Sequence, residues 1–101
     1  MSETFMPIQI TEKALEEVRN IMNSKEIPDD YGLRIGIRGT GCGGASHMLG
    51  FDHKKDNDMV YLREGISIYI EKKDVIYLVG IKLDYVHEES SSGFMFAKIQ
   101  D

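Results

Sequence analysis

Apolar side chains recur every three to four positions near the start of the chain and every second position through much of the rest. Leu15, Val18 and Met22 form one apolar stripe, with Ile21 beside it. This spacing predicts an amphipathic helix of about a dozen residues. Thr11 is the expected N-cap of that helix, because its hydroxyl can accept hydrogen bonds from the free amides of the first turn.

Alternation of apolar and polar residues predicts strands after this helix. Residues 33–37, 66–70 and 81–86 have the period of two that is typical of a half-buried strand. Shorter extended segments are expected over residues 8–10, 46–51, 59–62 and 94–99. The glycine-rich segment 39–44 is expected to leave regular strand geometry, and residues 72–78 fit either a short helical turn or a strand. The pattern as a whole predicts one helix packed against mostly antiparallel short strands.

Composition narrows the classes of partner. The 101 residues are expected to form a single domain, 1–101. A net charge of −5 without a lysine or arginine cluster argues against a nucleic-acid partner. No apolar run approaches the ~20 residues that span a bilayer. The first residues also lack the basic and apolar order of a secretory signal, so no membrane partner and a cytoplasmic location are expected.

The chain has one cysteine, Cys42, so a thiolate-rich metal site would have to be shared between chains. The flanking Gly41, Gly43 and Gly44 allow backbone amides to point into one concavity, which would stabilise a reactive thiolate. The alternative is a small buried residue in a tight loop that needs no ligand. His47 is the candidate second metal ligand, because imidazole and thiolate can share a metal ion.

The remaining candidate ligands are Asp52, His53, Asp56, Asp58 and His87. The spacing of the three aspartates fits no calcium loop, and a hairpin turn explains them better. The two histidines are expected at the surface. A catalytic pair of Cys42 and His47 would lack an orienting third group, so an enzyme is not expected.

Four short motifs occur in a fixed order: Ile10-Thr11-Glu12-Lys13-Ala14, Gly41-Cys42-Gly43-Gly44, Tyr77-Leu78-Val79-Gly80 with Leu83-Asp84-Tyr85-Val86, and Gly93-Phe94-Met95-Phe96. In order and spacing the chain resembles the A-type iron–sulfur cluster assembly proteins, the HesB/IscA family. The resemblance covers nearly the whole chain. It implies a HesB-like fold that is mainly β with helical cover (α+β), in which two small packed sheets accompany an N-terminal amphipathic helix. It also implies that the protein holds iron or an iron–sulfur cluster and passes it to apo-proteins.

The chain departs from the family pattern after the last motif. Family members follow it with Asn-Pro-Asn, a spacer and a Cys-Gly-Cys tail, whereas here Phe96 is followed by Ala97-Lys98-Ile99-Gln100-Asp101. Only Cys42 therefore carries over as a ligand position, with Gly41 and Gly43 as its neighbours in the cofactor-binding loop.

The leading hypothesis is a non-enzymatic iron–sulfur assembly or carrier protein. It would bind iron or a cluster weakly through Cys42 at the interface of a homodimer or tetramer, because clusters usually take four thiolates. The expected partners are iron–sulfur assembly proteins or apo-acceptors. One alternative is a metal-free interaction module on the same fold, with no cofactor. Another is a thiol redox or sulfur-transfer protein that uses Cys42 alone.

Overall fold

The structure is a computed structural model that describes residues 6–41 and 44–99, without the side chains of residues 39–45. The elements in chain order are β1 (Ile8–Ile10), α1 (Glu12–Ser24), β2 (Tyr31–Gly41), β3 (Gly44–His53), β4 (Asp58–Arg63), β5 (Ile66–Glu71), the 3-10 turn η1 (Lys72–Asp74), α2 (Val75–Leu78), β6 (Ile81–His87) and β7 (Ser92–Lys98). Neither helix of this described part has the length and apolar character needed to cross a membrane.

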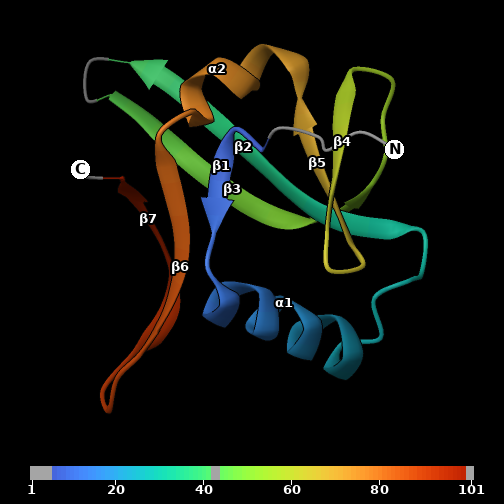
Figure 1. The fold of residues 1–101 in the computed structure, drawn as a ribbon, viewed down its shortest axis with the longest axis vertical. Helices are drawn as coiled ribbons and strands as arrows, with labels where there is room; N and C mark the ends of the chain where they lie inside the picture. Colours follow the sequence, from blue (N-terminus) through green and yellow to red (C-terminus); the bar gives the residue numbers. More distant parts are fainter. Residues whose placement is uncertain (1–5, 42–43, 100–101) are drawn as a thin grey trace.

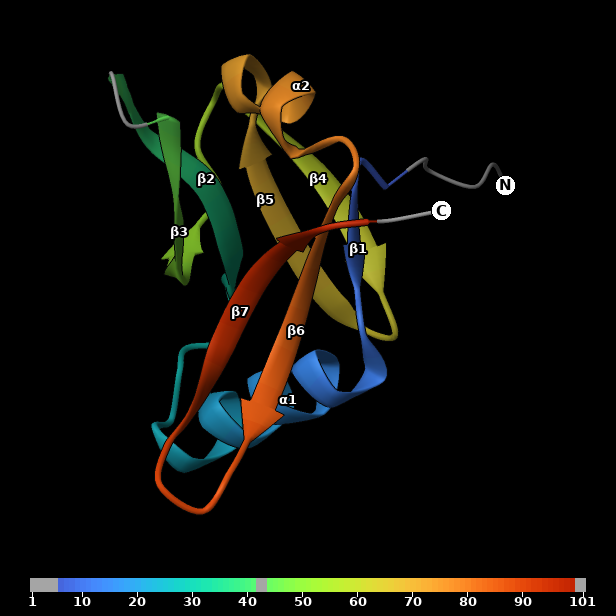
Figure 2. The same ribbon diagram turned by 90° about the vertical axis from the view of Figure 1, so that its left-hand side faces the viewer.

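The strands form two small mixed sheets, with orders β1-β6-β7 and β3-β2-β5-β4. Pairing is parallel between β1 and β6 and between β2 and β5, and antiparallel in the other three pairs. Figures 1 and 2 show α1 at one end of the sheets and α2 at the opposite end. This arrangement confirms the predicted α+β fold of two small sheets with an N-terminal helix.

The apolar stripe of α1 packs into the core as predicted, with Leu15 and Val18 fully buried. Thr11 caps the helix, since its Oγ1 accepts from the amide of Ala14 at 3.1 Å. The same hydroxyl donates to Oδ1 of Asp84 in β6 at 2.8 Å. One side chain therefore both starts the helix and joins it to the three-stranded sheet.

A single core connects the two sheets, because the inward-facing residues of the strands belong to one buried cluster. Its fully buried strand residues are Ile8, Leu33, Ile35, Ile68, Ile70 and Leu83. Burial of a side chain of this size stabilises the fold by roughly 1.5–3 kcal/mol. The period-two alternation was therefore a valid guide to the inner face of each strand.

The prediction that strand geometry ends at the glycine-rich segment was wrong. β2 continues to Gly41 and β3 begins at Gly44, and these two glycines are paired. Glycine lacks a side chain but keeps both backbone hydrogen-bonding groups, so a ladder can run through it. Among the described residues of this hairpin, the pairing is irregular between Arg38 and Thr40, where a β-bulge shifts the register.

The ambiguous segment 72–78 is helical, formed by η1 and α2. Gly80 then breaks the chain direction as expected, with φ of +83°, a value that glycine adopts without strain. The amide of Ile99 donates to the carbonyl of Gly80 at 2.8 Å, which holds the end of β7 beside this turn.

Candidate functional site

The hairpin of β2 and β3 carries the candidate ligand. Its ladder runs from the pair of Tyr31 and His53 to the pair of Gly41 and Gly44. Cys42 and Gly43 are the two residues between these paired glycines in the sequence, and they lie outside the described residues. The assignment of Gly41, Cys42 and Gly43 to a cofactor site stays a prediction.

His47 lies on β3 opposite Ile37 of β2. Residues paired across antiparallel strands share a face, and Ile37 is buried, so His47 projects toward the core side of its sheet. Its ring stacks on Phe96 of β7, with ring centroids 4.6 Å apart and planes inclined by 13°. His47 lies three positions along β3 from Gly44, which corresponds to ~10 Å. The structure thus gives His47 a packing role between the sheets and places it well back from the last hairpin pair.

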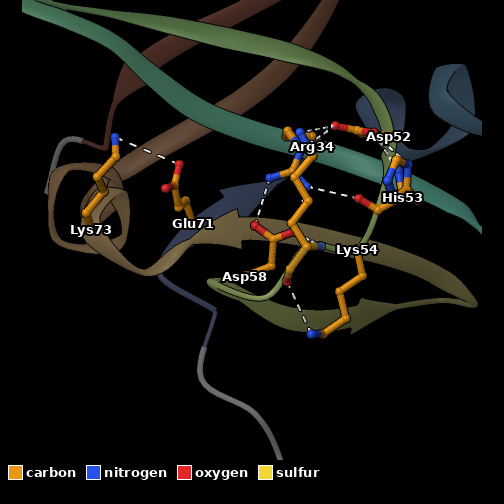
Figure 3. A network of polar contacts seen from close by, with 8 residues as sticks. Arg34, Asp52, His53, Lys54, Asp58, Glu71 and Lys73 are labelled. Carbon is orange, nitrogen blue, oxygen red and sulfur yellow. Dashed lines mark hydrogen bonds and ion pairs between the residues drawn. The ribbon is translucent and has the colours of Figure 1, made fainter.

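A network of charged side chains joins the outer face of β2 to the end of β3 and the start of β4 (Figure 3). Arg34 of β2 donates from Nη1 and Nη2 to the two oxygens of Asp58, at 2.8 and 2.6 Å. Its Nε donates to Oδ2 of Asp52 at 3.2 Å, and its Nη2 also donates to the carbonyl oxygen of His53 at 3.1 Å. The backbone amide of Lys55 also donates to Oδ2 of Asp58, at 2.7 Å.

These contacts show what the polar segment does. The hydrogen bond from Arg34 holds the pKa of Asp58 below its ordinary value. The pKa of Asp52 is lowered chiefly by the backbone amide of His53, and next by Lys55. Both carboxylates are therefore ionised and already paired. In the part of the chain that the structure describes, no group of three His, Cys, Asp or Glu residues is arranged to hold a metal ion. The hairpin-turn prediction for this segment was wrong, because the strands that it joins, β3 and β4, lie at opposite edges of the four-stranded sheet and are not paired with each other.

The two remaining histidines are at the surface, as expected. His53 is exposed, and its Nδ1 lies 3.1 Å from Oδ1 of Asp52. His87 is exposed at the end of β6. Neither is brought close to the β2–β3 hairpin end by the strand register.

Two residues beside the hairpin escaped the sequence analysis. Phe96 was recognised only as part of a motif, yet it stacks on His47. Asp74, at the end of η1, is buried and accepts from the backbone amide of Ile37 in β2 at 3.2 Å. A cavity of about 300 Å³ lies against both Asp74 and Arg34. An aspartate directly before a helical segment signals an N-cap, so nothing in the local sequence predicted a bond to a strand.

Comparison with known proteins gives the family. The model of the family described as iron–sulphur cluster biosynthesis matches residues 6–99. The iron-binding protein IscA of Serratia proteamaculans is 36% identical over 92 residues, which cover 90% of this chain and 84% of the relative. The mitochondrial iron-sulfur cluster assembly 1 homolog of Mus musculus is 32% identical over 97 residues, which cover 95% of this chain and 74% of the relative.

Solved structures support the fold. SufA of Escherichia coli, described as involved in biosynthesis of iron–sulfur clusters, superposes with a TM-score of 0.75 at 21% identity, covering 97% of this chain and 85% of that chain. A structure of IscA with the [2Fe-2S] cluster gives a TM-score of 0.68 at 22% identity, covering 90% of this chain and 81% of that chain. The fold, the family model and the relatives agree: the chain belongs to the iron–sulphur cluster biosynthesis family, whose members assemble or carry clusters and are not catalytic enzymes.

Proposed function

We propose that this protein is an iron–sulfur cluster assembly or carrier protein that binds iron or a cluster weakly through Cys42, at an interface between copies of the chain. The observation that carries the proposal is the paired Gly41 and Gly44 at the end of the β2–β3 hairpin. These two residues flank the one cysteine of the sequence. The IscA structure that holds a [2Fe-2S] cluster shares this fold.

One cysteine is too few for a cluster, so other copies of the chain, a histidine or an exogenous thiol would have to supply the remaining ligands. An iron–sulfur cluster usually takes four thiolates, with histidine as an occasional substitute. The 101 residues supply one thiolate, so a dimer would supply two and a tetramer four. Within this proposal the chain is one domain, its protein partners are assembly proteins or apo-acceptors, and its cytoplasmic location remains an expectation from the sequence.

His47 is the candidate histidine donor. Stacking on Phe96 covers a face of the imidazole, whereas a metal ion binds a ring nitrogen in the plane of the ring, so stacking and ligation are compatible. The separation of ~10 Å along the strand from Gly44 makes His47 a poor co-ligand for Cys42 of the same chain. A His47→Ala variant that retains bound iron would remove it from the ligand set.

Anaerobic reconstitution with iron and sulfide tests the proposal. The wild type would be compared with Cys42→Ser and with Ser46→Ala, a control for an exposed residue of the same hairpin. The readouts are visible absorbance, bound iron and sulfide per chain, and oligomeric mass. A chromophore that forms in the wild type and the control, is lost in Cys42→Ser and travels with a dimer or tetramer is the expected result.

Two other results would identify the alternatives. Bound iron in none of the three proteins would overturn the carrier proposal and favour a metal-free interaction module. Absence of iron together with fast alkylation of Cys42, and a trapped mixed disulfide with a partner, would favour the thiol redox or sulfur-transfer function.

A further inference from the structure

The outer half of β2 extends beyond its pairing with β5 in the four-stranded sheet. β2 pairs with β5 only at Leu33 and Arg34, opposite Ile68 and Tyr69. β2 nevertheless continues to Gly41, while β5 ends and the chain turns into η1 and α2. β5 ends at Glu71, two residues past Tyr69, so in this parallel register the described part of β2 runs past the end of β5 from Ile37 on.

Beyond the end of β5, the side chain of Asp74 provides a hydrogen-bond acceptor for the backbone of β2. Its Oδ2 accepts from the backbone amide of Ile37 at 3.2 Å, and its Oδ1 lies 3.2 Å from Nζ of Lys73. Only 5% of Asp74 is exposed. The contact joins residues 37 positions apart in sequence, so it fixes η1 and α2 against the hairpin.

The carboxylate makes this bond instead of the local one that its position would allow. Asp74 stands at the N-cap of α2, where an aspartate usually accepts from amides of its own helix. No such side-chain bond is present. The side chain points away from α2 and toward β2, so its hydrogen bond goes to the strand and not to its own helix.

Packing around Gly36 confirms how closely the carboxylate approaches β2. A Cβ atom added at Gly36 would lie 3.2 Å from Oδ2 of Asp74 and 3.3 Å from Cε of Met48. The β-bulge between Arg38 and Thr40 follows directly after Ile37. Bulges redirect a strand, so the anchor holds β2 immediately before the point where its direction is reset.

We propose that Asp74 is a positioning residue that fixes the outer arm of the β2–β3 hairpin, including the paired Gly41 and Gly44 that flank Cys42 in the sequence. The arm comprises residues 37–41 and 44–47. The consequence for iron rests on the proposed function of Cys42, whereas the consequence for the arm itself does not. Figures 1 and 2 show α2 at the same end of the molecule as the arm.

Amide hydrogen exchange of the apo protein tests the anchor directly. Asp74→Ala removes the acceptor of Ile37, and exchange at that amide and along the arm should accelerate on the order of tenfold or more relative to β5. Asp74→Asn keeps an oxygen that can accept the same bond, so its exchange should stay within about threefold of the wild type. Asp58→Ala is the matched control, because it removes an equally buried carboxylate that contacts the near end of β2.

The pattern across the variants decides the proposal. Faster exchange of the arm in Asp74→Ala, with near-normal exchange in Asp74→Asn and no selective change in Asp58→Ala, supports it. Unchanged exchange at Ile37, or the same acceleration in Asp58→Ala, overturns it. If Asp74→Ala does not fold, Gly36→Ala replaces it. The added methyl would lie 3.2 Å from Oδ2 of Asp74 and would require the carboxylate to shift by a few tenths of an ångström. Selective acceleration of exchange in the arm supports the anchor, and no acceleration overturns it.

Iron retention extends the test to the site. In reconstituted protein, the loss of iron to a chelator should be on the order of tenfold faster in Asp74→Ala than in Asp58→Ala. Equal rates of iron loss in the two variants would overturn a role of the anchor in iron retention. A wild type that takes up no iron would refute the proposed function instead, and hydrogen exchange would still decide whether Asp74 fixes the arm.

Discussion

Removal of the Asp58 carboxylate should destabilise the fold far more than removal of the neighbouring Asp52. Asp58→Ala deletes both bonds from the Arg34 guanidinium and the bond from the Lys55 amide. The Asp58 side chain is 1% exposed and that of Arg34 is 13% exposed. The variant therefore leaves a largely buried cation without its main partner.

The expected loss of unfolding free energy is about 3 kcal/mol, at the lower end of the range for breaking a buried pair. The lower end applies because Arg34 keeps Asp52 and the carbonyl oxygen of His53 as partners. At about 4–8 °C per kcal/mol for a domain of this size, Tm should fall by on the order of 15 °C. Asp52→Ala should lose clearly less unfolding free energy than Asp58→Ala, because Asp52 is a quarter exposed and makes one longer contact with Arg34.

Urea unfolding followed by far-UV circular dichroism is the suitable assay, since the chain has no tryptophan. A double variant, Arg34→Ala with Asp58→Ala, separates the pair from the cost of an unpaired partner. Equal losses in Asp58→Ala and Asp52→Ala, or a loss below about 1 kcal/mol in Asp58→Ala, would refute the view that this pair secures the base of the hairpin.

Three further predictions follow from individual contacts. The pKa values of Asp58 and Asp84 are lowered below their ordinary value of 3.8, chiefly by Arg34 and by the Thr11 hydroxyl. As the pH falls, these carboxylates therefore take up protons in the unfolded chain before they do so in the folded protein. Their contribution to the unfolding free energy is complete above about pH 5 and is lost as the pH falls below about 4. Urea midpoints measured down to pH 3 should show this fall, and Asp58→Ala should flatten it. Thr11→Ala should cost about 1 kcal/mol by circular dichroism, with Thr11→Ser near the wild type. Gly32→Ala should cost about 2 kcal/mol or more, because its Cβ would lie 2.6 Å from a backbone oxygen, while Gly50→Ala, with nothing within 4 Å, should be tolerated.

Sequence patterns predicted the elements whose cause is local. The stripe through Leu15 and Val18 and the cap at Thr11 depend on residues within one or two turns, and both were confirmed. The break at Gly80 likewise follows from its own backbone conformation. The end of β2 was predicted wrongly because strand length depends on the partner strand. β3 follows the glycines closely enough to continue the ladder to Gly41.

The polar contacts around the hairpin could not be predicted, because their partners are distant in sequence. Alternation placed Arg34 on the outer face of its strand, but Asp58 lies 24 positions away. The bond of Asp74 to Ile37 spans 37 positions and exists only because β5 stops before β2 does. His47 was selected for its chemistry, and its stacking on Phe96 depends on how the two sheets meet.

The two carboxylate anchors of β2 act on different parts of one hairpin. Asp58, through Arg34, secures β2 where it still pairs with β5, and Asp74 secures it where that pairing has ended. Between them the hairpin is held on one side by charged groups and on the other by the stack of His47 on Phe96. Local unfolding of a strand held in this way is unfavourable, because it would break contacts to several different elements. Motion should then concentrate beyond the bulge, so that exchange rates in the apo protein should rise from Ile37 toward Gly41 even in the wild type.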